Sequence, residues 1–427
     1  MGAALLVWWG ALAAGAPQTS IDSFEQIWQT LRDHYWDRSM SGLNWQAVHD
    51  RFLHELETKH SEGEAREVMN RMIHQLRSSH LAIIPGELYG SEGGKDGAGT
   101  QDRGAEPEDG VTGLRITVLE GVAVVEEVEE GSPAMEAGVE RGWVVESAAG
   151  RAVKSLFDLL DGTAEAKARL ATGIVQEWLS GPAGSAVAVS FKTSTGKIAS
   201  RTIGRRAPRG KLVQFGNLPP ERVVFEHRKL ASGAGYMRLN IFLDPVSVMP
   251  ELEKSIAELR SAPGIVLDLR NNPGGLGVMA MGIAGWFVSQ AGERLGTMTS
   301  RDMVMNFEIN PRLAPYTGRL AIVVNQDSAS TTEILAQGLQ DLGRARIFGT
   351  RTAGEALPSE IIELADGDRF QYPEANYVSV KGRTLEGNGV VPDVVVKPTL
   401  KTLLEGRDVA LEAAEEWAAG RAADARK

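Results

Sequence analysis

Residues 325–333 combine small hydroxyl side chains with a change of predicted secondary structure. Their sequence, NQDSASTTE, follows the apolar run at 320–324 and precedes a helix expected over 331–342. A serine at this turn lies at a helix N-terminus, where unpaired N–H groups and the helix dipole stabilise negative charge. The turn could therefore present a serine nucleophile and stabilise the oxyanion of a tetrahedral intermediate.

The same residues also fit an ordinary helix cap. Ser330 and Glu333 have the S-x-x-E spacing of a capping box, in which each side chain bonds the backbone N–H of the other residue. Taken alone, these nine residues favour the cap over a catalytic role. A catalytic assignment therefore needs support from elsewhere in the chain.

The composition of the chain excludes several kinds of catalytic chemistry. The chain has 427 residues and no cysteine, which excludes thiol catalysis, disulfides and cysteine-bound metals. A covalent intermediate would then need a hydroxyl nucleophile. The net charge of -11 argues against a nucleic-acid partner, because an acidic protein repels phosphate. No His-Glu-x-x-His pattern occurs, so we expect no metal site and no cofactor.

Histidines are distributed unevenly along the chain. Of the seven, only His227 lies outside the stretch from His34 to His80. An active site in the C-terminal half that needs an imidazole must use His227 or take one from the N-terminal segment. His227 lies at a polar strand end with no matching motif, whereas His80 alone could be a helix-end or core histidine.

A second candidate loop follows the apolar run at 264–269. It reads DLRNNPGG over residues 268–275, so charged, amide and glycine residues follow a strand expected to be buried on both faces. Glycines let backbone N–H groups approach a ligand closely. An ordinary strand-to-helix turn has the same features, so this loop alone is not decisive.

Apolar periodicity predicts the architecture around these loops. Residues 205–400 alternate strands and helices, which indicates an α/β sheet, with a helix over 277–290 and a hairpin turn at Asp366-Gly367. Residues 20–78 predict three short helices. Residues 401–427 read as one polar terminal helix.

The first sixteen residues, MGAALLVWWGALAAGA, resemble a secretory signal peptide that ends in a small-x-small site. The apolar run is too short to span a bilayer, which takes ~20 residues, and no other stretch qualifies. We therefore expect a periplasmic or secreted protein without a stable membrane span. A frayed apolar N-terminus or a misplaced start codon is the alternative.

Residues 111–204 contain short β runs, a helical stretch over 156–179 and the phrase EEGSPAMEAGVERGWVVESAAGRAV, which resembles the signature of PDZ domains. Ser132-Pro133 would start a short helix, Gly138 would end it, and a strand would follow. Trp143 stands where an acidic residue is usual. The resemblance implies a PDZ fold, and such domains bind an extended peptide, here a C-terminal peptide, by strand addition.

The phrases LDLRNNPGG and SASTTEILAQGLQDLGRARIFGTRTAG together resemble the tail-specific, or C-terminal processing, serine peptidases. Those proteins combine an N-terminal helical segment, a PDZ domain and a crotonase-like, ClpP-type α/β core. The resemblance implies that Ser330, rather than Ser328, is the nucleophile. It also implies an oxyanion hole formed by the backbone N–H of Thr331 and of Gly274 or Gly275.

One departure from the processing peptidases concerns the base. Where they carry a lysine 25 residues after the nucleophile, this chain has Glu355. The tricorn-like branch uses Ser, His, a second Ser and Glu instead, and this chain has Ser79-His80 after its helices and Glu386 before Gly-Val-Val-Pro-Asp. The resemblance implies that His80 is the general base and that Ser79 and Glu386 orient it.

The sequence thus predicts a serine endopeptidase that cleaves peptides or unfolded protein tails through an acyl-enzyme. The alternative is a non-catalytic peptide- or ligand-binding protein on the same fold, as in the retinoid-binding proteins of the eye. A third interpretation, a Ser-Lys enzyme that uses Lys381, matches no motif. The expected parts are a signal peptide (1–16), a helical domain (17–85), a flexible linker (86–110), a PDZ-like domain (111–204), an α/β core (205–400) and a C-terminal helix (401–427).

Overall fold

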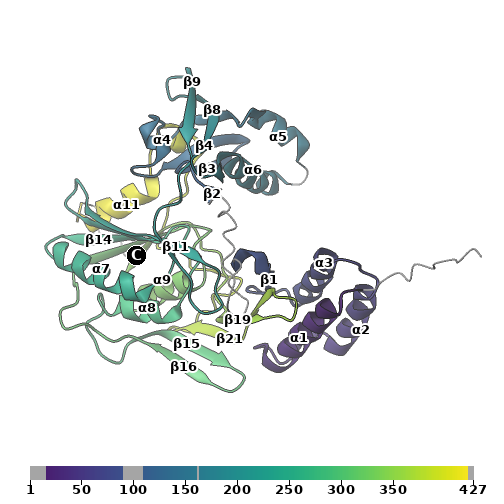
Figure 1. Ribbon diagram of the computed structural model, residues 1–427. Helices are drawn as coiled ribbons and strands as arrows, with labels where there is room; N and C mark the ends of the chain where they lie inside the picture. The colour runs from purple at the N-terminus through teal and green to yellow at the C-terminus, as the bar shows by residue number, and fades with distance from the viewer. Residues whose placement is uncertain (1–15, 90–108, 161–162, 422–427) are drawn as a thin grey trace, which may run out of the picture.

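The computed structural model describes residues 16–89, 109–160 and 163–421 (Figure 1). The predicted signal peptide, apart from Ala16, and most of the predicted linker lie outside these residues. Within the described ranges, no helix is long and apolar enough to cross a membrane.

A six-stranded sheet forms the centre of the molecule and confirms the predicted mixed α/β fold. Neighbouring strands from β13 to β22 run parallel, and β12 joins the edge antiparallel. Strand β14 is buried along its whole length, as its nearly continuous apolar run predicts. In spatial order the strands are β12 (Phe225–Lys229), β13 (Gly235–Leu239), β14 (Gly264–Asp268), β17 (Arg319–Val324), β18 (Arg346–Gly349) and β22 (Val394–Val395).

Helices cover both faces of this sheet. Helices α7 (Pro245–Glu258), α8 (Gly277–Ala284) and α9 (Thr331–Asp341) pack on one face in the largest hydrophobic cluster. Helix α11 (Val409–Ala418) packs small alanine side chains on the other face (Figure 1). Alternate residues of each central strand therefore serve two separate cores.

The helix after β14 and the terminal helix have bounds that differ from the prediction. Helix α8 ends at Ala284 instead of reaching residue 290, since the carbonyls of Gly285 and Trp286 accept N–H groups from Arg312 and Tyr316. The single terminal helix is replaced by α10 (Leu400–Leu404) and α11.

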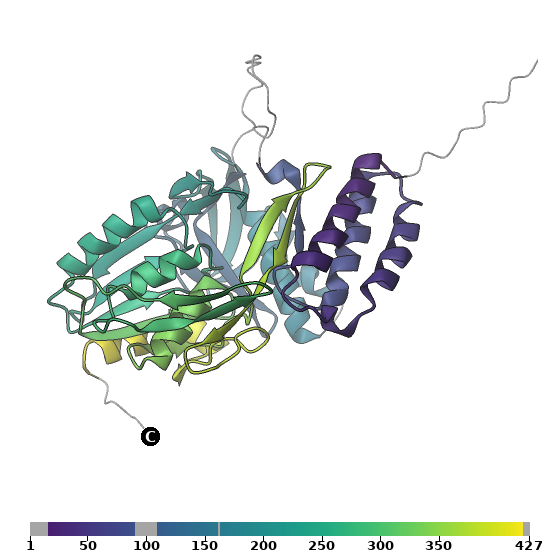
Figure 2. The same ribbon diagram turned by 90° about the horizontal axis from the view of Figure 1, so that it is seen from below.

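The first part of the chain forms the predicted helical bundle of α1 (Gln18–His34), α2 (Trp45–Leu56) and α3 (Glu62–Ile73). The short strand β1 (Ala82–Ile84) follows it and pairs with β20 (Arg369–Pro373), which forms a hairpin with β19 (Ser359–Glu363). Figure 2 shows this yellow-green hairpin between the core and the purple helices.

The hairpin fixes the helical bundle to the core. Its side chains Leu364, Phe370 and Tyr372 are buried in the hydrophobic cluster of the bundle. In addition, both carboxylate oxygens of Asp368, at the predicted hairpin turn, accept hydrogen bonds from the guanidinium of Arg66, one of them at 2.8 Å. The residues that follow α3 are therefore held against the core sheet.

Residues 109–206 form a separate antiparallel sheet with its own hydrophobic cluster. The strand order is β3-β4-β5-β8-β9, and helices cover the sheet where the sequence predicted helical segments. The elements are β2 (Asp109–Gly110), β3 (Leu114–Leu119), β4 (Val122–Val128), α4 (Pro133–Glu136), β5 (Val144–Ala148), β6 (Arg151–Ala152), α5 (Val153–Leu159), α6 (Ala164–Leu179), β7 (Gly181–Pro182), β8 (Ala186–Lys192) and β9 (Ile198–Gly204).

Helix α6 covers the outer edge of β3. The Gln176 side-chain amide accepts from the N–H of Ile116 at 3.2 Å and donates to the carbonyl of Leu114 at 2.8 Å. The Thr172 hydroxyl accepts from the N–H of Val118 at 3.1 Å. An added strand at this edge would have to displace both side chains.

The remaining elements are short and lie in the helical bundle, in the chain that follows it, and around the core. They are η1 (Met40–Gly42), η2 (His74–Leu76), η3 (Gly86–Tyr89), the pair β10 (Lys211–Val213) and β11 (Glu221–Val223), and the sheet of β15 (Arg294–Ser300), β16 (Val304–Glu308) and β21 (Ala375–Ser379).

Asp408 joins three parts of the molecule. It accepts hydrogen bonds from Arg141 of the separate sheet domain at 3.1 Å and from Arg270 of the core at 2.8 Å. It also caps α11 by accepting from the N–H of Leu411. The two arginines outweigh the effect of burial and lower the pKa of Asp408 to about 2.

Candidate functional site

The two candidate loops meet at the carboxyl ends of β14 and β17, as neighbouring parallel strands require. The carbonyl of Asn272, in the first loop, accepts hydrogen bonds from the N–H of Ala329 and the hydroxyl of Thr332, both at 3.0 Å. Asn272 is fully buried. This contact brings the DLRNNPGG loop against the turn that carries Ser330.

Ser330 precedes α9 in a backbone conformation that is uncommon for a residue with a side chain, with φ 53° and ψ -119°. Its side chain is partly exposed. Ser328 differs, because it is fully buried and its hydroxyl donates to the carbonyl of Leu269 at 2.8 Å. Ser328 has a structural role, whereas Ser330 is accessible.

The helix-cap interpretation of Ser330 holds only in part. The Glu333 carboxylate accepts from the N–H of Ser330 at 3.0 Å, as in a capping box. The two residues hold the positions of that motif, but the Ser330 hydroxyl makes no N-cap hydrogen bond that meets ordinary distance and angle limits. Even in a complete capping box the Ser330 hydroxyl only accepts, so its proton stays free to be donated.

The backbone of Gly274 packs against the Ser330 side chain and the start of α9. Gly274 approaches so closely that a Cβ there would lie 2.7 Å from the Cβ of Ser330 and 2.9 Å from the nitrogen of Thr331. Only glycine fits this position, and its φ of 106° also favours glycine. The hydroxyl of Thr331 donates to the carbonyl of Gly275 at 2.7 Å and ties the loop to the start of α9.

The three predicted oxyanion-hole residues are not equivalent. The N–H of Gly274 donates to the side-chain oxygen of Asn272 at 2.9 Å, so it is already engaged. No hydrogen bond from the N–H of Gly275 or of Thr331 to another described residue is found. These two groups are the better candidate donors to an oxyanion.

Ser79, His80 and Glu386 form one hydrogen-bonded cluster. Glu386 accepts from the N–H of Ser79 at 3.0 Å and from its hydroxyl at 2.9 Å, across 307 residues of sequence. The hydroxyl oxygen of Ser79 lies 2.8 Å from Nδ1 of His80. The structure thus brings Glu386 to two neighbouring residues that lie far from it in the sequence.

The chemistry of this cluster decides the histidine tautomer. An ionised Glu386 can only accept hydrogen bonds, so the Ser79 hydroxyl donates its hydrogen bond to Glu386. The Ser79 oxygen must then accept from Nδ1–H of His80, which leaves the lone pair on Nε2. Burial lowers the pKa of His80 below its usual 6.5, although Glu386 opposes this effect. His80 is therefore a neutral imidazole with a basic Nε2 at neutral pH.

Residues 355 and 356 connect the two halves of the candidate site. The N–H of Ser330 donates to the carbonyl of Glu355 at 2.8 Å, and the N–H of Ala356 donates to Glu386 at 3.2 Å. The structure contains no hydrogen bond between the His80 ring and the Ser330 hydroxyl. Catalytic hydrogen bonds are often long without substrate and tighten when it binds.

The other candidate bases lie in different surroundings. The Nε2 of His227 is 2.7 Å from Glu258, and His227 lies on the edge strand β12. Lys381 is exposed, and its backbone N–H bonds Asp341. Glu355 contributes backbone groups while its side chain is exposed. In the described parts of the chain no three His, Asp or Glu side chains could hold a metal ion.

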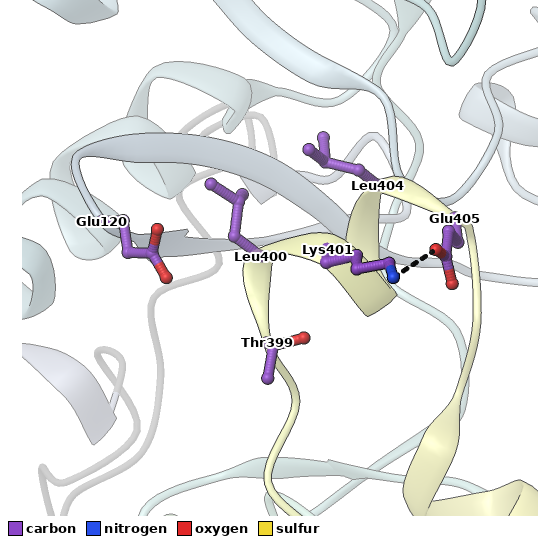
Figure 3. A pocket seen from close by; sticks show the side chains of 6 residues that line it. All are labelled: Glu120, Thr399, Leu400, Lys401, Leu404 and Glu405. Atoms are coloured by element: carbon purple, nitrogen blue, oxygen red, sulfur yellow. Dashed lines mark ion pairs between the residues drawn. The ribbon is translucent and has the colours of Figure 1, made fainter.

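The hollow shown in Figure 3 lies elsewhere, where α10 faces the turn before β4. An ion pair of 4.0 Å between Lys401 and Glu405 lies within it. None of the residues that line it belongs to the candidate site.

Sequence reasoning missed two residues that organise the site. The sequence shows Asn272 only as part of an amide-rich loop and Glu333 only as half of a helix cap. An amide before Pro-Gly-Gly was the available signal for Asn272. For Glu333 the relevant partners lie beyond residue 350, and no local pattern shows them.

Two parts of the chain match known protein families. Residues 233–396 match peptidase family S41, and residues 21–74 match the tricorn protease C1 domain. The first match covers both candidate loops and Glu386. The second ends shortly before Ser79.

Relatives that match along most of their length are named processing peptidases. A carboxyl-terminal-processing protease of Picosynechococcus sp. is 29% identical over 388 residues, which covers 88% of this chain and 83% of that protein. A chloroplastic C-terminal processing peptidase of Tetradesmus obliquus is 25% identical over 405 residues and covers 92% and 82%.

Solved structures share the fold at lower sequence identity. A photosystem II D1 C-terminal processing protease superposes with a TM-score of 0.55 at 22% identity, over 92% of this chain and 99% of that chain. The tricorn protease superposes with a TM-score of 0.51 at 16% identity, over 94% of this chain and 37% of that chain. These two structures therefore share the fold of this chain.

Proposed function

We propose that the chain, a serine endopeptidase of the tail-specific, C-terminal processing peptidases of family S41, acts through an acyl-enzyme on Ser330 with His80 as general base. The observation that carries this assignment is the cluster of Ser79, His80 and Glu386, joined to Ser330 through residues 355 and 356. Neutral His80 with a basic Nε2 suits the role.

The reaction follows the general chemistry of serine acyl transfer. Nε2 of His80 takes the proton of the Ser330 hydroxyl as the Ser330 oxygen forms a bond to the scissile carbonyl carbon. The carbonyl oxygen becomes an oxyanion that accepts hydrogen bonds from the N–H groups of Thr331 and Gly275. The C–N bond then breaks, and His80 returns the proton to the leaving amine. Water then attacks the acyl-enzyme and gives a proton to Nε2 of His80. His80 returns that proton to the Ser330 oxygen as the new carboxyl terminus is released.

Ser79 and Glu386 orient the base and stabilise the imidazolium that forms during each step. When His80 is protonated, Nδ1–H still donates to the Ser79 oxygen, and the Ser79 hydroxyl still donates its hydrogen bond to the Glu386 carboxylate. The negative charge of Glu386 then faces a positive ring through one hydroxyl. Glu386 raises the pKa of His80 against the effect of burial, which is the same interaction seen in the resting site.

We propose that the natural substrates are peptides or unfolded protein tails. The supporting observation is that relatives with similar coverage are named for carboxyl-terminal processing. We also propose that the cleavage takes place in the periplasm or outside the cell, as the signal-peptide resemblance of residues 1–16 indicates. N-terminal sequencing of the exported protein tests that location.

We propose the domain division inferred from the sequence, with a PDZ domain over 111–204 that gates access or selects C-termini. Separate hydrophobic clusters in the helical bundle, the antiparallel domain and the crotonase-like core support the division. A C-terminal peptide that adds beside β3 must displace Gln176 and Thr172 from the strand edge. Peptide binding and a shift of α6 are therefore coupled.

Hydrolysis of a chemically unfolded protein by the purified chain tests the proposed function. The wild type should cleave it, and Ser330→Ala should lose the cleavage while Ser328→Ala keeps it in proportion to the folded fraction. The non-catalytic binding protein is the correct interpretation if wild type neither cleaves nor reacts with a fluorophosphonate probe. Cleavage that survives in Ser330→Ala would instead move the nucleophile to another residue.

A further inference from the structure

Glu333 does more than a helix cap requires. Its side chain lies in the first turn of α9 and is fully buried, with an exposed fraction of 0%. A buried carboxylate is costly unless donors surround it. On the basis of the proposed role of Ser330, we propose that Glu333 is a positioning residue that fixes the nucleophile turn against the loop leading to Glu386.

Four donors converge on this carboxylate. One oxygen accepts the N–H of Ser330 at 3.0 Å and the N–H of Glu355 at 2.9 Å. The other oxygen accepts the N–H of Gly354 at 2.9 Å and the hydroxyl of Thr352. A capping box needs only the Ser330 contact, so three of the four donors come from a different segment of the core.

These contacts reach both halves of the site. In the 352–355 loop the carbonyl of Glu355 accepts from the N–H of Ser330. The N–H of the next residue, Ala356, donates to Glu386. Glu333 therefore sets the position of Ser330 relative to the residue that anchors Ser79 and His80. It also holds Ser330 at its positive φ, a conformation that persists only where surrounding contacts enforce it.

The chemistry of the four donors requires a carboxylate. Each oxygen of Glu333 receives two donors, so both must be acceptors. In Glu333→Gln the side-chain NH2 would face two of the donors, either those at Ser330 and Glu355 or those at Gly354 and Thr352. The volume is nearly unchanged, so the substitution removes the acceptor without opening a cavity.

Asp341 provides a matched control at the other end of the same helix. Its side chain is also fully buried, accepts from the Gln337 amide, the Ser379 hydroxyl and the N–H of Lys381, and forms an ion pair of 3.4 Å with Arg383. None of these partners contacts the nucleophile turn. Asp341→Asn thus has the same chemical change on the same helix, away from the site.

The experiment compares the full chain with Glu333→Gln and Asp341→Asn at a temperature where all are folded. The readouts are kcat and KM for an unfolded substrate, the rate of fluorophosphonate labelling and Tm. We expect kcat and labelling of Glu333→Gln to fall about 100-fold with KM changed less than about threefold, the scale of a misplaced reacting group. Asp341→Asn should have a lower Tm than the wild type and nearly the same kcat.

Equal losses in the two variants, scaled to their Tm, would overturn the positioning role, and so would a Glu333→Gln enzyme with wild-type kcat. If Glu333→Gln does not fold, Thr352→Val removes one donor contact and should lower kcat more than its Tm loss explains. Ser330→Ala is run in parallel. If it still cleaves and labels, the assignment of Ser330 fails whatever Glu333 does.

Discussion

The nucleophile side and the base side of the site are built in different ways. Ser330 lies in a turn whose contacts, to Asn272, Glu333 and Glu355, all belong to the α/β core. Ser79 and His80 follow the helical bundle and reach the core through Glu386. The difference indicates that the nucleophile and oxyanion donors are preformed, whereas the base depends on how the bundle docks.

His80 is also held in an uncommon backbone conformation, with φ 58°. Strain of this kind persists where surrounding contacts enforce it. For His80 those contacts include the pairing of β1 with β20 and the ion pair of Arg66 with Asp368. Separating the two sides experimentally should therefore leave an intact nucleophile without its base.

The largest effect is expected for His80→Ala, which removes the base and leaves the core side unchanged. Hydrolysis should fall by at least about 10³-fold, because general-base catalysis contributes about 10² to 10⁴-fold and the activation of Ser330 is also lost. Initial rates with an unfolded substrate measure this. His227→Ala is the control and should keep its rate; a reversed result would assign the base to His227.

The second-largest effect is expected for Glu386, whose carboxylate orients His80 through Ser79. In Glu386→Gln the amide can turn its NH2 toward Ser79, which no longer needs to accept from Nδ1 of His80. The tautomer with a basic Nε2 then loses its advantage, and we expect kcat to fall about 10² to 10⁴-fold. A kcat within about threefold of wild type would remove Glu386 from the site.

Weakening the docking of the bundle should have a smaller effect. Arg66→Met leaves Asp368 with one backbone donor, Gly86, and should destabilise the folded protein by about 1.5 to 3 kcal/mol. Activity should fall further than the folded fraction does, since the base side moves. Urea unfolding and initial rates are measured on the same samples.

Arg71→Met is the matched control for this docking contact. Arg71 lies on the same helix and pairs with Glu55 within the bundle, on the exposed side. Its removal should cost no more than about 1 kcal/mol and leave kcat unchanged. If Arg71→Met lowers kcat as much as Arg66→Met, the bundle affects activity through stability alone.

The smallest effect is a shift in the pH profile. Protonated His80 cannot accept the Ser330 proton, so kcat/KM should fall as pH drops through the pKa of His80. Because burial lowers that pKa, the acid limb should lie below the usual 6.5. In Glu386→Gln the opposing charge is gone, and the residual limb should move to still lower pH. An acid limb above 6.5 would contradict the buried, neutral imidazole.

The sequence predicted the parts that depend on local pattern. The apolar runs of β14 and β17, the three N-terminal helices and the hairpin turn at Asp366-Gly367 follow from periodicity and turn chemistry. The association of Ser79, His80 and Glu386 came from family resemblance, because no local rule joins residues 307 positions apart.

The rest depends on tertiary partners that a sequence does not display. Helix α8 stops early since carbonyls after Ala284 bond another loop. Gly275 and Thr331 are distinguished from Gly274 only by the side chain of Asn272. From the sequence alone Glu333 is recognisable only as a helix cap, because the other three donors to its carboxylate lie in residues 352–355.

The most direct test of the central claim is to map the site of a fluorophosphonate adduct on the folded chain by peptide mass spectrometry. The account predicts one labelled residue, Ser330, with labelling that is slowed strongly in His80→Ala and absent in Ser330→Ala. A label on Ser328 or on any other residue, or labelling that His80→Ala leaves at the wild-type rate, would contradict it.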